Sequence, residues 1–170
     1  TLGNIMQGNL DQLGPPEFTK KEKVYAKKYQ DTLSRKDIES AYSHAGIDLV
    51  EGEVLAGSVV SGDTEPVDMG GSTDVADVSW VVPTVSLWGA NYAIGTPFHS
   101  WQMTAQGKSS IAIKGMTHAA MVMAATGSDL MTKRHILDDA WSEHNKTIEK
   151  EGYMLPISLS ASPPIKDMAP

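Results

Sequence analysis

Of the residues in this 170-residue chain, His99 is the strongest candidate for a role in catalysis or metal binding. It lies in the segment 95–102, G-T-P-F-H-S-W-Q, which the surrounding pattern places in a loop between a strand and a buried helix. Functional residues concentrate in loops held by a rigid scaffold. A neutral imidazole there is a candidate ligand for zinc or manganese. The alternative is an imidazole that only hydrogen-bonds the loop backbone.

The other four histidines have settings typical of structural roles. His118 falls in an apolar helical segment, where a hydrogen-bonded core histidine is the ordinary case. His135 and His144 lie too far apart to share the i, i+4 face of a helical metal pair. His44 stands at a predicted helix end, where its ring interacts favourably with the helix dipole.

The segment 70–77, G-G-S-T-D-V-A-D, is the second candidate site. Its glycines permit positive φ and a close approach of the backbone, so Gly71, Ser72 and Asp74 are candidates for lining a substrate pocket. The alternative is a turn in which Asp and Ser cap their own backbone. A Ser72–His99–Asp74 triad is disfavoured, because no G-x-S-x-G elbow surrounds the serine.

These residues do not complete a catalytic centre. One histidine cannot hold a catalytic metal, which takes about three protein ligands. The chain has no cysteine, which excludes thiolate sites and disulfides, and its carboxylates lack a recognisable metal-site spacing. Phosphate-binding and dinucleotide-binding glycine motifs are absent as well. Spacing alone therefore leaves the reaction open.

The N-terminal part of the chain predicts a connector followed by two helices. Residues 1–16 are polar and end in Gly-Pro-Pro, which indicates a tail or connector. Thr19 and Glu22 have the spacing of a capping box at the start of a helix. Ser34 is a candidate cap for a second, shorter helix that Gly46 ends.

The remainder predicts strands and then two more helices. Residues 47–93 hold valine-rich runs separated by turn residues, and 79–92 is the best strand candidate, interrupted at Pro83. A helix over about 109–125 is apolar nearly all round and is therefore expected to be buried on most sides. An amphipathic helix follows over 134–151. This order predicts an α/β or α+β layer structure.

Composition narrows the class of protein. The formal net charge of −7 argues against a nucleic-acid partner, since such proteins normally carry a basic face. No apolar run approaches the roughly 20 residues that span a bilayer, and the first residues do not form a basic segment followed by an apolar stretch. We expect a soluble, cytoplasmic protein that binds neither nucleic acid nor membranes.

Two ordered motifs carry a resemblance to a known family. The first covers 71–80, G-S-T-D-V-A-D-V-S-W, with V-P-T at 82–84; the second is the His99 segment, followed by A-Q-G-K-S at 105–109 and K-G-M at 114–116. Together they resemble aminobenzoyl-glutamate hydrolases of the zinc-dependent aminoacylase and carboxypeptidase metallopeptidase family. The resemblance spans nearly the whole chain.

The resemblance implies an α/β fold: the C-terminal part of a three-layer αβα, two-metal catalytic domain, with the dimerisation domain absent. Residues 1–16 would then be a connector and 17–170 the C-terminal portion of the catalytic domain. In that family His99 matches the last ligand of a pair of divalent ions, zinc or manganese, and the other ligands and the general base come from the N-terminal half. No catalytic residue is expected in this chain, which alone is expected to bind no metal.

The implied function is part of a metal-dependent amidohydrolase that cleaves an acyl- or aroyl-amino acid such as aminobenzoyl-glutamate. The expected partners are a small-molecule amide substrate and either the missing N-terminal half or another chain; members of the family are usually homodimers. The alternative is a truncated, non-catalytic relative that serves as a binding or interaction module, since every other ligand and the base are absent from the sequence.

Overall fold

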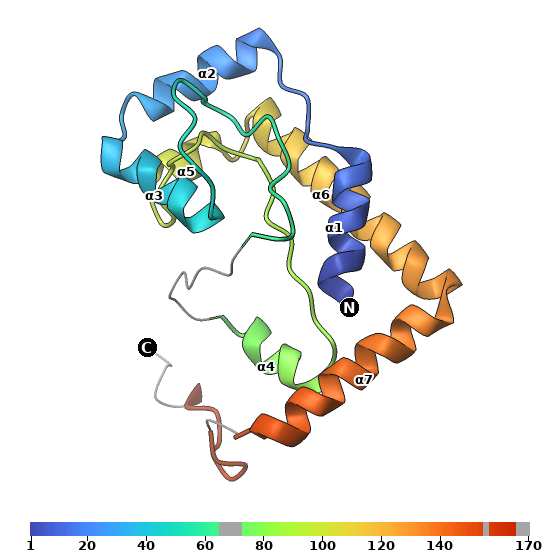
Figure 1. Ribbon diagram of the computed structural model, residues 1–170. Coiled ribbons are helices and arrows are strands. Elements are labelled where there is room, and N and C mark those ends of the chain that lie inside the picture. The colour runs from blue at the N-terminus through green and yellow to red at the C-terminus, as the bar shows by residue number, and fades with distance from the viewer. Residues whose placement is uncertain (65–72, 155–156, 166–170) are drawn as a thin grey trace.

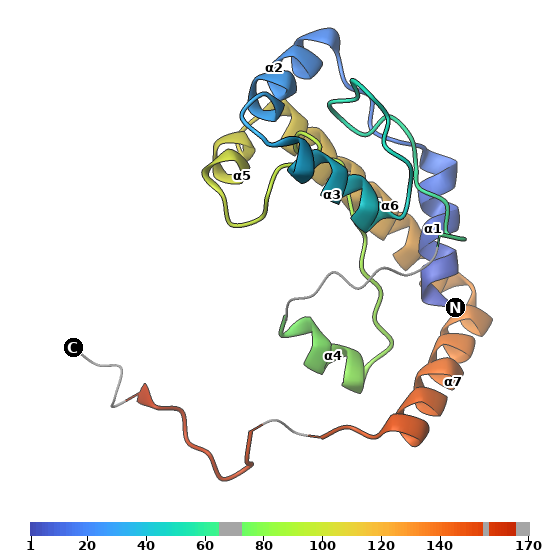
Figure 2. The same ribbon diagram turned by 60° about the vertical axis from the view of Figure 1, so that its left-hand side comes forward.

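The computed structural model describes residues 1–64, 73–154 and 157–165. These residues form seven helices: α1 (Leu2–Leu13), α2 (Lys20–Gln30), α3 (Arg35–Ala45), α4 (Val75–Val81), α5 (Trp101–Gln106), α6 (Ser110–Thr132) and α7 (Arg134–Glu151). Figures 1 and 2 show an open, curved arrangement with α2, α3 and α5 at one end and α4 and α7 at the other. None of the helices within the described ranges is long and apolar enough to cross a membrane.

Local capping explains where α2 and α3 begin. The Thr19 hydroxyl accepts a hydrogen bond from Glu22 N at 3.3 Å, and Thr19 N donates to the Glu22 carboxylate at 2.7 Å. Ser34 and Asp37 form the same reciprocal box at the start of α3. Gly46, at φ 66°, ends α3 in the left-handed conformation that glycine adopts freely. The predictions of these two helices are confirmed.

The two long helices of the C-terminal part are also confirmed. Ser109 caps α6 by accepting from Ala112 N at 3.1 Å, and α6 continues to Thr132, beyond the predicted end near residue 125. Helix α7 has the predicted bounds and is followed by Gly152 at φ 70°. Only Lys133 separates the two helices, which Figure 1 shows as two arms meeting at a sharp angle.

Helix α1 lies within the segment expected to be a connector. It packs along α6, and Asn9 Nδ2 donates to Asp129 Oδ2 at 3.0 Å. Met6 is buried and is one of four apolar residues at helical spacing, Leu2, Met6, Leu10 and Leu13. The polar residues between these positions masked the pattern. The division into a connector at 1–16 and a domain portion at 17–170 stays a prediction.

The predicted α/β class, with its three-layer αβα sandwich, is wrong for the part of the chain that is described. All regular structure there is helical, and α4 occupies the start of the best strand candidate. Helix α4 ends before Pro83 because the residue preceding a proline is disfavoured in the α conformation; Val82 is extended. The segments around Val54 and Ile94 meet through one backbone hydrogen bond, Ile94 N to Val54 O at 3.0 Å.

That correction has a physical reason. The preference of valine and other β-branched residues for strands reflects their fit to a pleated surface beside a neighbouring strand, rather than an independent backbone preference. A strand also needs a repeating ladder of hydrogen bonds. One bond does not make a ladder, so the valine-rich runs are extended loops and a short helix.

The core lies where α2 and the start of α6 meet the loops. Ala26, Leu55, Ala93 and Ile111 are buried together, with Phe18, Tyr25, Tyr29 and Val54 packed around them. On α6 the buried positions Ile111, Gly115, Val122 and Thr126 share one face. The opposite face is exposed, contrary to the expectation that α6 is buried on most sides. Ile113, Met116 and Met123 on that face are exposed, so no element among the described residues covers them.

Candidate functional site

The loop that carries His99 is held in place from both sides. Gly95, at φ 90°, lies against α3: a Cβ there would come within 2.9 Å of Ile38 Cγ1 and 3.0 Å of Ile38 Cα. Both the backbone conformation and the close approach therefore require glycine. At the other end of the loop, Ser100 begins α5 by accepting from Met103 N at 3.2 Å, while its hydroxyl donates to Pro97 O at 2.7 Å.

Gln106 fixes the loop from inside. Its side chain is 1% exposed; Oε1 accepts from Ala93 N at 2.8 Å and Nε2 donates to Thr96 Oγ1 at 3.1 Å. Thr96 Oγ1 donates in turn to Ala93 O at 2.6 Å. Because a buried amide without partners is costly, this network specifies one loop conformation. Sequence reasoning missed Gln106, whose only signal is a polar residue beside a glycine-rich loop.

His99 itself is exposed at the turn of this loop. Its φ of 58° makes it the one described non-glycine residue in the left-handed region. Such conformations are found at binding and catalytic sites more often than elsewhere. The ring makes no hydrogen bond to any residue that the structure describes, so the alternative of a histidine tied to the loop backbone receives no support. The scaffold presents an imidazole outward.

Of the other predicted site residues, Asp74 is the one that the structure describes. Gly71 and Ser72 lie outside the described residues. Asp74 is exposed at the start of α4, where its side chain does not cap the helix. Over residues 1–64, 73–154 and 157–165, no three His, Asp or Glu side chains gather into a group able to hold a metal ion. The described residues thus offer one candidate metal ligand, His99, and do not by themselves fit a two-metal centre.

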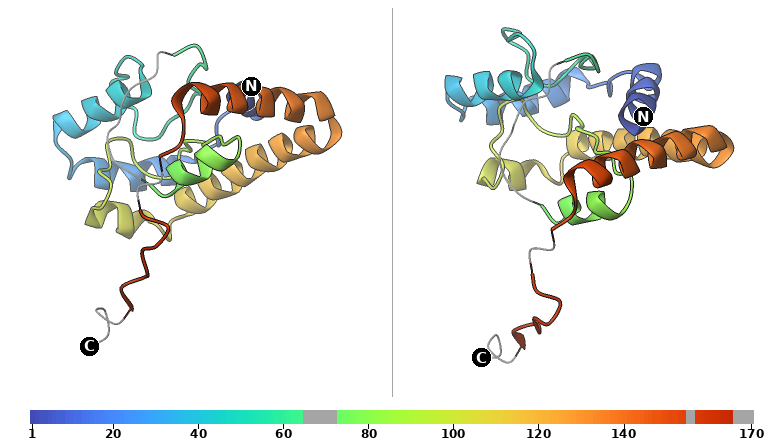
Figure 3. Two further views of the ribbon diagram at one scale, coloured as in Figure 1. Left: turned by 90° about the horizontal axis from the view of Figure 1, so that it is seen from below. Right: turned by 60° about the horizontal axis from the view of Figure 1, so that its bottom comes forward.

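Two of the remaining histidines bridge helices. His118 Nε2, on α6, lies 2.6 Å from the carbonyl oxygen of Gly14 at the end of α1. His144 Nε2, on α7, lies 3.1 Å from Ser79 O on α4, and its ring packs edge-on against Trp141 at 5.5 Å. Figure 3 shows α4 lying beside α7 in both views. These contacts agree with the structural roles predicted for both residues.

A cavity of about 850 Å³ opens between α1, α3 and the loops within 53–62 and 85–98. Four aromatic residues line it, Tyr42, Trp88, Tyr92 and Phe98. Trp88 and Tyr92 each pack against Phe98, with ring centres 5.8 and 6.2 Å apart. We call it the aromatic cavity. Burial raises the pKa of Tyr92 above its ordinary value, as expected for a phenol drawn out of water. Phe98 directly precedes His99, so one loop forms both a wall of the cavity and the candidate ligand.

Asn91 belongs to the loop between α4 and α5. It lines the cavity, and its Oδ1 is buried without a hydrogen-bond partner among the described residues. Gly115 of α6 lets Asn91 approach: a Cβ on Gly115 would lie 2.5 Å from both Asn91 Cβ and Ala90 O. Sequence reasoning did not single out Asn91, because no spacing or periodicity marks it.

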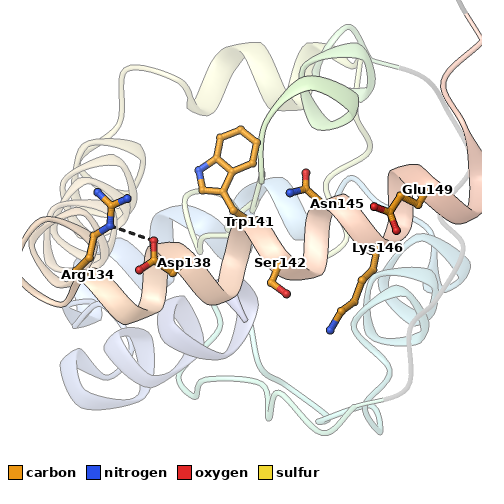
Figure 4. Close-up of a pocket in the computed structure, with 7 residues that line it drawn as sticks. All are labelled: Arg134, Asp138, Trp141, Ser142, Asn145, Lys146 and Glu149. Atoms are coloured by element: carbon orange, nitrogen blue, oxygen red, sulfur yellow. Dashed lines mark hydrogen bonds and ion pairs between the residues drawn. The ribbon is translucent and has the colours of Figure 1, made fainter.

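A second hollow, of about 640 Å³, follows the outer face of α7 (Figure 4). Its lining residues all come from this one helix: Arg134, Asp138, Trp141, Ser142, Asn145, Lys146 and Glu149. Arg134 Nε pairs with Asp138 Oδ1 at 3.0 Å, an exposed i, i+4 pair of the kind common on helix surfaces. An open face of a single helix encloses no ligand, so this hollow is a poor candidate site.

A curated protein matches nearly the whole of this chain. The chain is 34% identical over 177 aligned residues to a subunit of p-aminobenzoyl-glutamate hydrolase from Escherichia coli (strain K12). The match covers 98% of this chain and 37% of the relative, so the chain spans little more than a third of that protein's length. No family model matches the chain, and no solved structure matches it.

The chain is therefore a relative of an aminobenzoyl-glutamate hydrolase subunit, which confirms the resemblance that the two motifs predict. The partial coverage of the relative fits the expected correspondence to the C-terminal half of a longer protein.

Proposed function

We propose that this chain is part of an amidohydrolase that cleaves the amide bond of an acyl- or aroyl-amino acid, with aminobenzoyl-glutamate as the first substrate to test. The observation that carries the proposal is 34% identity over 98% of the chain to a protein named as a subunit of p-aminobenzoyl-glutamate hydrolase. The outward imidazole of His99, on a loop fixed by Gly95 and Gln106, supports it as a prearranged functional group.

The proposed role of His99 is to be one ligand of a divalent zinc or manganese ion. A neutral imidazole is a good ligand for either ion, and His99 is exposed. The described residues supply no further cluster of donors, so the remaining ligands would come from elsewhere. Gly71, Ser72 and Asp74 keep their proposed role in substrate binding.

The chain is proposed to work with another polypeptide segment: the N-terminal half of the hydrolase or a separate subunit. The matched relative is itself named as a subunit. Helix α6 supports the proposal, because Ile113, Met116, Ala120 and Met123 form an exposed apolar stripe on a different side of the helix from its buried face. A stripe of this kind on a soluble chain marks an interaction site. We call these four residues the α6 stripe.

Release of 4-aminobenzoate from aminobenzoyl-glutamate tests the proposal. The assay uses this chain co-expressed with the upstream segment or partner subunit that purifies with it, with added zinc or manganese. The expected result is turnover that requires both polypeptides. Turnover of another acyl- or aroyl-amino acid instead would keep the reaction class and change the substrate.

A non-catalytic binding module is the second candidate function. The observation that favours it is the single candidate ligand within the described residues. It would be the better account if a folded, metal-supplemented complex hydrolysed none of a panel of acyl- and aroyl-amino acids.

A further inference from the structure

Helix α2 concentrates positive charge in a chain that is acidic as a whole. The formal net charge of the chain is −7. Five of its 14 lysine and arginine residues nevertheless lie in α2: Lys20, Lys21, Lys23, Lys27 and Lys28. All five are exposed, whereas Glu22, Ala26 and Gln30 of the same helix are buried. We call the five lysines the lysine face.

Little of this positive charge is cancelled by ion pairs. The one acidic residue of α2, Glu22, is buried and accepts from Lys114 Nζ of α6 at 2.8 Å, so its charge is already balanced. Lys27 pairs with Asp31. The other four lysines form no ion pair with any residue in the described ranges. The lysine face therefore remains a source of positive potential.

The chain around His99 contains no carboxylate. All 21 acidic residues lie outside the stretch between Asp77 and Asp129, which includes the His99 loop, α5 and most of α6. Exposed Lys108 follows α5 and adds a further positive charge. Helix α3, which Gly95 contacts, has two basic and two acidic side chains and so adds no net charge.

Helix α2 contacts α5, so the lysine face lies beside the loop that leads into α5. The ring of Tyr29 packs against that of Trp101 with 6.3 Å between ring centres, and Gln102 Nε2 donates to Thr32 Oγ1 at 3.4 Å. Lys28 directly precedes Tyr29 in this contact. Figures 1 and 2 both show α2 and α5 at the same end of the molecule.

We propose that the lysine face and Lys108 create a positive region that draws small carboxylates to the His99 loop, against the repulsion expected from the net charge of the chain. Exposed charges act over about 10 Å at 0.1 M salt, so nearby lysines outweigh distant carboxylates. A surface of one sign raises the local concentration of ions of the other sign. An acyl-amino acid keeps its α-carboxylate; that such a substrate is the anion guided to His99 rests on the proposed function.

Paramagnetic relaxation of backbone amides in the 170-residue chain tests the proposal without a partner or hydrolysis. The probes are two soluble nitroxides of similar size, anionic carboxy-PROXYL and cationic aminomethyl-PROXYL. The ratio of their effects on an amide reports the sign of the local potential. At low salt the carboxylate probe is expected to relax the exposed residues Phe98 and His99 more strongly than the ammonium probe does. About 1 M salt should bring the two effects close together.

Two double variants with the same change in net charge locate the source of the potential. Lys21 and Lys28 are seven residues apart and therefore lie on one side of α2. Lys21→Gln with Lys28→Gln is expected to lower the ratio of carboxylate to ammonium effect at His99 about two- to threefold, the value for two charges at about 10 Å in water. Lys146→Gln with Lys150→Gln, on α7, should leave that ratio unchanged. All four lysines are exposed, so both variants are expected to fold.

The proposal is overturned if the ammonium probe relaxes His99 more strongly than the carboxylate probe, or if the two double variants change the ratio equally. The expected ratios in the chain, beside a complex that hydrolyses no acyl-amino acid, would leave this inference standing and reject the proposed function. Hydrolysis by a complex whose chain shows no preference for the carboxylate probe would do the reverse.

Discussion

Glu22 joins the N-terminal helices to α6 through charge. Its carboxylate accepts from Lys114 Nζ and Ser110 Oγ, each at 2.8 Å, as well as from the Thr19 backbone N–H of its capping box at 2.7 Å. The hydrogen bond from Lys114, followed by that from Thr19, lowers the pKa of Glu22 to about 2, against the opposing effect of burial. The folded state therefore strongly favours the charged form of the Glu22 carboxyl group over its neutral form.

Replacing Glu22 by Gln is expected to reduce the free energy of unfolding at neutral pH by about 2 kcal/mol, because it removes a buried charge-assisted contact. The folded-state pKa lies below the ordinary 4.5, so the contribution is complete above pH 4.5 and disappears as pH falls through about 2. Urea unfolding across this window should show a smaller loss of stability in Glu22→Gln than in the wild type. Glu39→Gln, in an exposed pair with Arg35, is the control and should follow the wild type. Identical pH profiles for Glu22→Gln and wild type would contradict the assignment.

At this scale the sequence singles out the His99 loop as a candidate site, but it does not show which residues hold that loop in place. His99 stands out because histidine in a Gly- and Pro-containing loop is chemically conspicuous. Gln106 and Asn91 do not, because the roles of both depend on contacts with chain segments brought close only by folding. A buried amide and an exposed one have the same local spacing, so only the tertiary structure separates them.

Helices that begin at a local capping motif could be predicted from the sequence, whereas elements that depend on distant contacts could not. The reciprocal caps Thr19–Glu22 and Ser34–Asp37 act within four residues, and the helices that they start were predictable. The valine-rich segments were not, since a strand exists only beside a partner strand and the described residues supply none. Helix α1 was missed because its apolar positions are few and lie among polar residues.

The close contact between α6 and the loop before α5 predicts how two glycine substitutions in α6 change the stability of the chain. Gly115→Ala places a Cβ 2.5 Å from the Ala90 carbonyl oxygen, so the loop or the helix must shift, at a cost of about 2 kcal/mol or more. Gly127→Ala on the same helix has nothing within 4 Å of the new Cβ and is expected to stabilise by up to about 1 kcal/mol, through helix propensity. Thermal unfolding of the two variants, compared with the wild type, measures both effects. Equal shifts in the same direction would show that the loop does not lie against α6 as described.

The whole molecule is open, with an apolar helix face that nothing in the described chain covers. The buried and exposed apolar faces of α6 lie on different sides of the helix: Ile111, Gly115, Val122 and Thr126 on one, the α6 stripe on another. A helix apolar on both faces is stable in water only when both are covered. The molecule as a whole therefore agrees with a chain that works in association.

Charging the α6 stripe is expected to prevent that association without unfolding the chain. Met116 and Met123 are 64% and 60% exposed, so the Met116→Lys, Met123→Lys double variant should fold as the wild type does. Analytical ultracentrifugation and co-purification with the upstream segment or partner are expected to show loss of the complex. The control is Met154→Lys, which changes an exposed methionine beyond α7. A complex that survives the double variant would place the partner on another surface.

The most direct test of the central claim, that His99 belongs to a hydrolytic metal site, compares two histidine variants of the co-expressed complex. His99→Ala is expected to lower the rate of 4-aminobenzoate release by about 100-fold or more and to reduce the bound zinc or manganese per complex, measured by plasma mass spectrometry. His135→Ala, an exposed histidine on α7, should change neither. Full turnover and full metal content in His99→Ala would contradict the claim.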